Sequence, residues 1–87
     1  MATETKRFTI PSANYFAVTA GHYAVFVRPT TPVAMRLHIG TSLPLPGTTD
    51  FVPIAGNSMS FSDLGGGDNV YLMAEAAGAE VAVVRTA

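Results

Sequence analysis

Strict alternation of apolar and polar side chains marks the clearest element of the chain, residues 33–39. Alternate positions of this segment carry four apolar residues, Val33, Met35, Leu37 and Ile39. Arg36 and His38 fall between them and should therefore point away from the core. A repeat of two residues is typical of a strand with one buried face, so this pattern predicts a half-buried β-strand.

Similar patterns predict further strands along the chain. In residues 58–62, three serines alternate with Met59 and Phe61, which should face inward. The stretch 69–75 is apolar on both faces, which indicates a central strand or one at an interface. Segments rich in β-branched and aromatic residues complete the set: 7–10, 15–20, 22–28, 50–54 and 80–85. Pro53 lacks an N–H donor, so its strand is expected at the edge of a sheet.

Glycine and proline separate these segments. Residues 29–32 read Pro-Thr-Thr-Pro, so the region 22–39 should form a hairpin or a corner. Residues 76–79 read Ala-Ala-Gly-Ala, and Gly78 suits the positive φ that a tight hairpin requires. We therefore expect the strands that flank this turn to pair with each other. Loops are expected over 40–49 and 64–68.

Seven or eight short strands with turn signals about every 8 to 12 residues are typical of an all-β protein. No segment shows a sustained period of 3.6 residues. We expect an antiparallel β-sandwich or a jelly-roll-like barrel, formed by a single domain over residues 8–87. Residues 1–7 are polar and lack periodicity, so we expect a flexible N-terminal arm that becomes ordered on docking.

Composition narrows the possible functions. Hydrophobic residues make up 48% of the 87 residues, which excludes a disordered tail. Charged residues make up only 13%, compared with about 25% in typical domains. The formal net charge of −1 argues against a protein that binds nucleic acid by neutralising phosphates. Cysteine is absent from the sequence, so disulfides and thiolate metal sites are ruled out.

Signals for membrane insertion and secretion are also missing. No apolar run approaches the ~18 residues that a membrane-spanning helix needs. No apolar segment follows the basic pair Lys6–Arg7, as it would in a secretory signal. We therefore expect a protein that is made in the cytoplasm and makes no contact with a membrane.

The sequence offers no pattern that predicts a catalytic, cofactor or metal site. His22 and His38 are the two histidines, and a metal site would require a third ligand. The candidates for that ligand are Asp50, Asp63 and Asp68. The glycines of residues 65–67 precede a strand and have no lysine beside them, so a tight turn is expected there and not a phosphate-binding loop. We therefore expect that the protein is not an enzyme.

Three tyrosines leave one alternative open, a carbohydrate-binding or surface-binding module. Tyr15, Tyr23 and Tyr71 would serve such a module if they formed an exposed, coplanar stacking surface. Burial of these rings in the core, which is the usual role of aromatic residues in a sandwich, would remove this alternative.

The predicted outer faces carry many Ala, Val, Thr and Met residues and few charges. Lysine occurs once, at Lys6, although soluble β-proteins usually carry many charged residues on their exposed faces and edge strands. A surface of this kind indicates contact with another chain, including copies of the same chain. The expected interface residues are Arg28, Arg36, His38 and Arg85.

Most of the region 15–85 resembles small virion structural proteins of tailed bacteriophages. The segments that carry the resemblance are Tyr23–Arg28, Thr30–Thr41, Phe51–Ile54, Leu64–Glu75 and Ala79–Arg85. They share with that group a polar turn, an alternating strand that ends in Gly-Thr, and a later Gly-Asp-Asn before an apolar strand and a Val-rich strand.

The resemblance implies a head decoration (cement) protein, which is β-rich, often trimeric and without catalytic residues. Such a protein binds the major capsid protein on the outside of an assembled shell and is found in the virion. Many copies bind together, so weak contacts add up through effective concentration. A tail, neck or fibre-associated module of the virion is the alternative within the same group.

Overall fold

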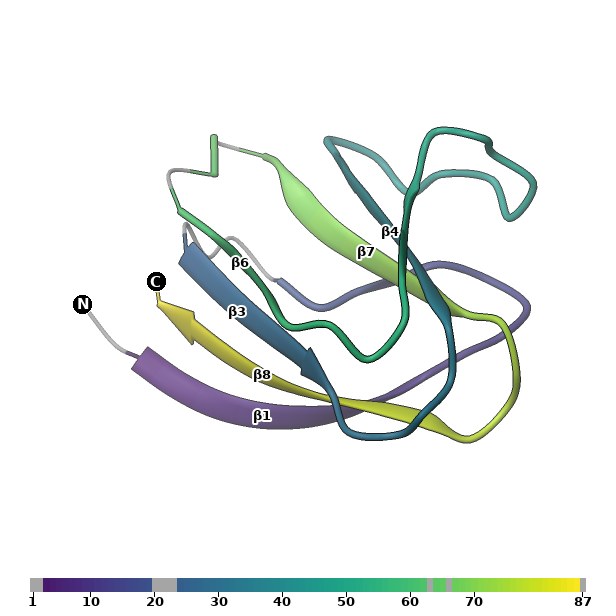
Figure 1. The fold of residues 1–87 in the computed structure, drawn as a ribbon. Coiled ribbons are helices and arrows are strands. Elements are labelled where there is room, and N and C mark those ends of the chain that lie inside the picture. Colours follow the sequence, from purple (N-terminus) through teal and green to yellow (C-terminus); the bar gives the residue numbers. More distant parts are fainter. Residues whose placement is uncertain (1–2, 20–23, 63, 66, 87) are drawn as a thin grey trace.

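A computed structural model describes residues 3–19, 24–62, 64–65 and 67–86. These residues form two four-stranded antiparallel sheets that pack face to face, and the described part contains no helix (Figure 1). The predicted all-β antiparallel sandwich is therefore confirmed. The strands are β1 (Thr3–Ile10), β2 (Phe16–Ala17), β3 (Ala24–Pro29), β4 (Met35–Gly40), β5 (Val52–Ile54), β6 (Met59–Phe61), β7 (Asn69–Ala74) and β8 (Ala79–Thr86).

The strand order is that of a jelly roll. Sheet A has the order β1-β8-β3-β6, and sheet B has the order β2-β7-β4-β5. The pairs β1·β8, β2·β7, β3·β6 and β4·β5 are all antiparallel, as if one long two-stranded ribbon had been rolled into two sheets. The sequence left open a β-sandwich or a jelly-roll-like barrel. The structure is a β-sandwich whose strands are connected as in a jelly roll.

The core lies between the two sheets and follows the alternation of the strands. In β8 every second side chain is buried, and Val81 and Val83 are completely inaccessible to solvent. In β4, Met35 and Leu37 face the core, as the alternation predicted. The apolar strand β7 lies between β2 and β4, which confirms its predicted central position. The short edge strands β5 and β6 also agree with prediction, because Pro53 lies at an edge and Met59 and Phe61 pack against the core.

The predicted hairpin between β7 and β8 is wrong. The two strands belong to different sheets, so the turn between them carries the chain from sheet B to sheet A. Gly78 has the expected positive φ, 84°. A turn signal predicts where the chain reverses direction, but the strand with which each segment pairs depends on tertiary packing. The region between β3 and β4 is likewise a corner between sheets, the second of the two forms predicted for it.

The predicted N-terminal arm is also corrected, because residues 3–7 belong to β1. They pair with β8 from Thr3↔Thr86 to Arg7↔Ala82. Backbone pairing does not require an apolar face, and all five residues are exposed. For this reason the hydrophobic pattern detects only the last part of the strand, and the folded domain begins before residue 8.

Most of the other strands also differ by a few residues from the predicted segments. β2 covers only Phe16–Ala17 of the predicted 15–20, although Val18 N–H still donates to Val70 O at 3.0 Å. β3 begins at Ala24. His22 and Tyr23, which begin the predicted strand 22–28, lie outside the described residues.

Candidate interaction surface

The structure distributes the four predicted interface residues over three different environments. Arg28 is exposed on the outer face of sheet A. Arg36 and His38 lie on the outer face of sheet B, as the alternation of their strand predicted. Arg85 points inward. The four residues therefore do not form one site, and only the pair on β4 is brought together.

Arg85 is a buried structural residue, which corrects its predicted role as an outward contact. Only 8% of it is exposed, because it shares the inward direction of Val81 and Val83 on β8. Its Nη1 donates to the backbone oxygen of Val18 at 2.8 Å, and its Nε donates to Glu4 Oε1 at 2.8 Å. These two hydrogen bonds hold the guanidinium of Arg85 inside the sandwich.

Neighbouring side chains hold Arg36 in place. Its Nε donates to Glu75 Oε2 at 3.2 Å, and its guanidinium lies 4.6 Å from the ring centroid of Phe51. Both members of the ion pair are partly exposed, so the pair contributes little to stability. The stacked and paired guanidinium nevertheless has a defined orientation on the outer face of sheet B.

A hydrogen bond of His38 connects the end of the β4–β5 loop to β4. Its Nδ1 lies 2.6 Å from the backbone oxygen of Asp50, and its imidazole lies about 6 Å from the rings of Tyr15 and Tyr71. Gly40 leaves room for this ring, because a Cβ at position 40 would lie 2.9 Å from His38 Nε2. The histidine therefore helps to position the loop.

Tyr15 and Tyr71 do not form the stacking surface that a sugar-binding module needs. Tyr15 is only 4% exposed and Tyr71 only 5%, and with Met73 they form a small cluster on the outer face of sheet B. Tyr23 lies outside the described residues. The exposed aromatic pair that would favour carbohydrate binding is therefore not formed by these two rings.

Burial of Tyr15 leaves its hydroxyl oxygen without a hydrogen-bond partner among the described residues. Desolvation raises the pKa of this phenol above its ordinary value of 10.0. The charge of Arg36 acts against this increase, and the charge of Glu75 adds to it. The small cluster beneath Arg36 and His38 therefore contains an unpaired polar group.

Tyr15→Phe should raise the free energy of unfolding by roughly 1 kcal/mol near neutral pH, because an unpaired buried hydroxyl is costly. The folded protein holds the phenolic proton to a higher pH than the unfolded chain does. Wild-type stability is thus complete below about pH 10 and falls as the pH rises through the folded pKa. The variant should lack this decline. Urea unfolding on both sides of pH 10 measures the two effects, and a destabilised variant at neutral pH would contradict them.

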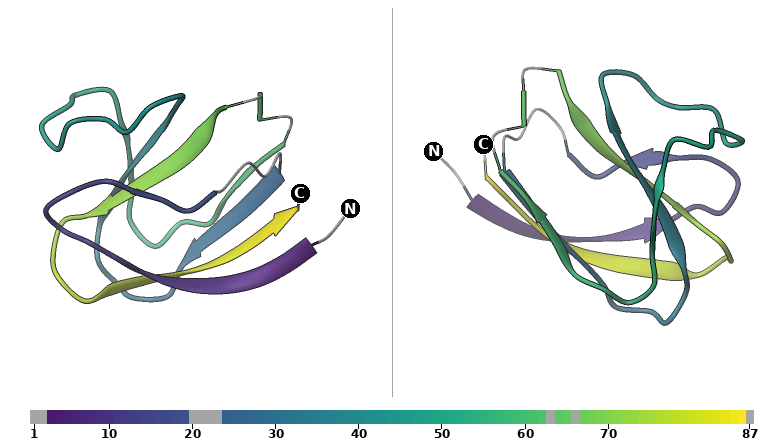
Figure 2. Two further views of the ribbon diagram at one scale, coloured as in Figure 1. Left: turned by 180° about the vertical axis from the view of Figure 1, so that it is seen from behind. Right: turned by 45° about the horizontal axis from the view of Figure 1, so that its top comes forward.

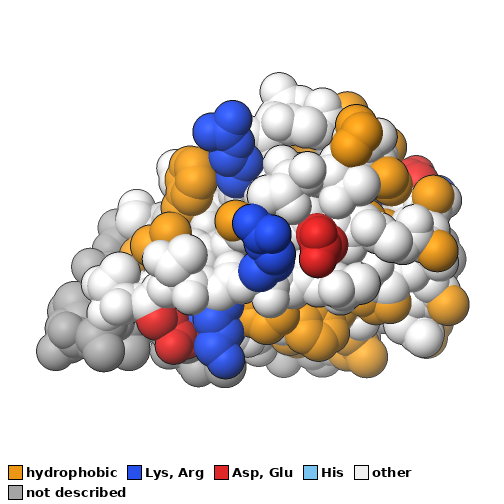
Figure 3. Space-filling view, turned by 90° about the horizontal axis from the view of Figure 1, so that it is seen from below, with side chains coloured by type: hydrophobic (Ala, Val, Ile, Leu, Met, Phe, Trp, Pro, Cys, Tyr) orange, Lys and Arg blue, Asp and Glu red, His pale blue; other side chains and the backbone are white. Residues whose placement is uncertain are grey.

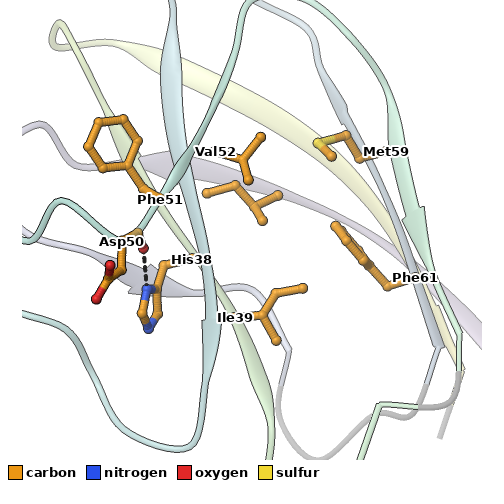
Figure 4. A pocket seen from close by; sticks show the side chains of 8 residues that line it. His38, Ile39, Asp50, Phe51, Val52, Met59 and Phe61 are labelled. Atoms are coloured by element: carbon orange, nitrogen blue, oxygen red, sulfur yellow. Dashed lines mark hydrogen bonds between the residues drawn. The ribbon is translucent and has the colours of Figure 1, made fainter.

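An apolar groove opens at the edge of the sandwich where β5 and β6 face each other. It has a volume of about 270 Å³. Ile39 and Val52 from sheet B and Met59 and Phe61 from sheet A point toward a common space (Figure 4). His38 and Asp50, joined by their hydrogen bond, complete its rim. The groove exposes part of the core because both edge strands are only three residues long.

The β4–β5 loop also carries exposed apolar side chains. Leu43 is 60% exposed and Leu45 is 79% exposed. The loop has internal structure, since Thr48 N–H donates to Leu45 O at 3.0 Å. It projects from the end of the sandwich away from the chain termini (Figures 1 and 2). The sequence predicts a loop here, but no pattern in it singles out the two leucines; Leu43 precedes Pro44, and Leu45 lies between Pro44 and Pro46.

The described residues show no arrangement suited to metal binding. They contain no group of three His, Cys, Asp or Glu residues close enough to hold an ion. His38 contacts Asp50 through the backbone oxygen and not through the carboxylate. His22 and Asp63 lie outside the described residues.

In the part of the chain that the structure describes, no helix is long and apolar enough to cross a membrane.

Comparison with known proteins identifies no relative. No family model matches the chain, and neither a curated protein nor a solved structure matches it. The assignment of a function therefore depends on the sequence and on the surface described above.

Proposed function

We propose that this chain is a non-enzymatic structural protein of a tailed-phage virion, which binds the assembled shell in many copies and stabilises it. The observation that supports this most directly is the exposed apolar surface at one end of the sandwich. This end surface consists of Ile39, Leu43, Leu45 and Val52, which are 38%, 60%, 79% and 50% exposed.

The position of the end surface suits a decoration protein. Leu43 and Leu45 are held on a loop with internal hydrogen bonds, so little conformational entropy is lost on docking. Arg36 and His38 lie at the base of the same loop, where they add polar contacts around the apolar residues. The partner would be the major capsid protein. Jelly-roll folds occur in viral capsid proteins, but also in lectins, so the fold alone does not decide the function.

Replacing both loop leucines, Leu43→Ser with Leu45→Ser, should weaken shell binding at least about tenfold, because each shell-bound copy loses its most exposed apolar contacts. The melting temperature should change little, since both side chains are exposed in the isolated protein. Cosedimentation with assembled shells that lack the protein measures the number of copies bound.

Phe26→Ser provides the matched control for this experiment. Phe26 is also an exposed apolar residue, at 39%, but it lies on the outer face of sheet A, away from the loop. The control should bind shells like the wild type. Normal binding by the double-leucine variant would contradict the proposed docking surface, and no binding of the wild type to any shell would contradict the proposed function.

A further inference from the structure

β1 differs from the other three strands that lie at the edges of the two sheets. β2, β5 and β6 contain two or three residues each, whereas β1 contains eight. Natural β-proteins keep edge strands short because a long edge is a template for another strand. Among the described strands β1 pairs only with β8, and its residues 3–7 are all exposed. The views in Figures 1 and 2 agree that β1 borders its sheet.

The free edge of β1 offers backbone hydrogen bonds to a further strand. In an antiparallel ladder, alternate residues direct N–H and C=O groups away from their partner strand. Half of the residues of β1 therefore present these groups on the side opposite β8. An extended segment that adds to this edge would gain main-chain hydrogen bonds together with side-chain contacts on both faces.

We propose that two copies of this chain pair antiparallel through residues 3–7 of β1, around a two-fold axis at Thr5. The two A sheets then form one continuous eight-stranded sheet. A two-fold axis between antiparallel strands is perpendicular to the sheet, so residues directly opposite each other lie on the same face. Only registers in which the paired residue numbers are both odd or both even satisfy this condition.

Charge complementarity selects one of these registers. With Thr5 opposite Thr5 of the second copy, Glu4 lies opposite Lys6 twice, and Thr3 lies opposite Arg7. Registers centred on Glu4, Lys6 or Arg7 place like charges directly opposite each other, which is destabilising. A register centred on Phe8 places Lys6 opposite the apolar Ile10, and registers centred beyond Phe8 place Lys6 past the end of the strand. Figure 3 shows that Lys or Arg side chains and Asp or Glu side chains both occur on the underside of the molecule.

The fold already orients the acidic member of the pair. Glu4 Oε1 accepts from Arg85 Nε at 2.8 Å, and Arg85 is itself fixed by the Val18 carbonyl. A carboxylate accepts several hydrogen bonds, so Lys6 of the second copy adds to this network and does not replace it. Glu4 and Lys6 stay accessible because the edge strand of the opposite sheet, β2, contains only two residues.

The pairing involves five residues from each copy, which makes it a small contact. Interfaces of this size are weak and transient, so the dimer is best detected by trapping. A two-fold contact also closes on two copies, whereas the trimer that the phage resemblance implies would require a different surface. The dimer is independent of the proposed shell binding, which uses the other end of the molecule.

Thr5→Cys tests the register, because the chain has no cysteine of its own and the new sulfur lies at the two-fold axis. Opposite residues in a ladder are about 5 Å apart, within the range for a disulfide. Under mild oxidation this variant should form a disulfide-linked dimer about tenfold faster than Thr9→Cys. Thr9 is an exposed threonine on the same face of β1, but roughly 26 Å from its symmetry mate in this register.

A second pair of variants tests the charges. Added to Thr5→Cys, Lys6→Glu places two carboxylates opposite each other and should slow crosslinking about tenfold at low salt. Arg28→Glu changes the net charge equally on an exposed site of another strand and should leave the rate unchanged. Equal crosslinking at positions 5 and 9, or equal rates for the two charge variants, would overturn the proposal.

Discussion

Leu72→Ala should lower the free energy of unfolding by about 3 to 5 kcal/mol, the range typical of a fully buried leucine. Leu72 is completely inaccessible to solvent. It lies on β7, one of the two inner strands of sheet B, opposite Phe16 on one side and Leu37 on the other. Strands on both sides hold the backbone in place, so the cavity cannot collapse easily. Urea unfolding followed by circular dichroism measures the loss.

Leu45→Ala is the matched control, because the same atoms are removed from a side chain that is 79% exposed. Its effect on the free energy of unfolding should stay within about 0.5 kcal/mol. Together the two variants test the arrangement of the layers. Similar losses at both positions would mean that Leu72 is not in the core, or that the β4–β5 loop packs against the sandwich.

The strands could be predicted well because most of them have one face in the core and one face toward solvent, and their residues alternate accordingly. In β4 the alternation placed Met35 and Leu37 inward and Arg36 and His38 outward, as the structure shows. β8 illustrates where this signal fails. Both of its faces are largely apolar, since Ala82 and Val84 alternate with Val81 and Val83. With no polar face to compare, the pattern does not show that Arg85 shares the buried side.

Strand pairing could not be predicted from local sequence. Gly78 marks a reversal of the chain, but whether a reversal forms a hairpin or crosses between sheets depends on contacts with strands that are distant in sequence. β1 was missed in part for a related reason, because its first five residues are held by backbone pairing with β8 and bury no apolar face. Exposed leucines in the β4–β5 loop have no periodicity, so hydrophobic patterns give no information about their role.

Arg85→Ala should lower the free energy of unfolding by about 2 to 3 kcal/mol, although it removes a charged residue from a largely apolar interior. Two partners of this side chain contribute unequally. Glu4 has a side chain that is 44% exposed, so its ion pair with Arg85 is screened by water and contributes little. The hydrogen bond to the Val18 carbonyl is buried, and truncation at position 85 leaves that oxygen without this donor.

Three further variants separate these contributions in the same urea unfolding experiment. Glu4→Gln should cost less than about 1 kcal/mol, because it weakens the exposed ion pair with Arg85 and keeps the buried hydrogen bond from Arg85 to Val18. Arg85→Lys should recover only part of the lost stability. The ammonium group of lysine cannot reproduce the geometry with which the guanidinium donates to two partners. Arg28→Ala, at an exposed arginine, should be nearly neutral. If Glu4→Gln costs as much as Arg85→Ala, the ion pair and not the buried carbonyl contact stabilises this end of the sandwich.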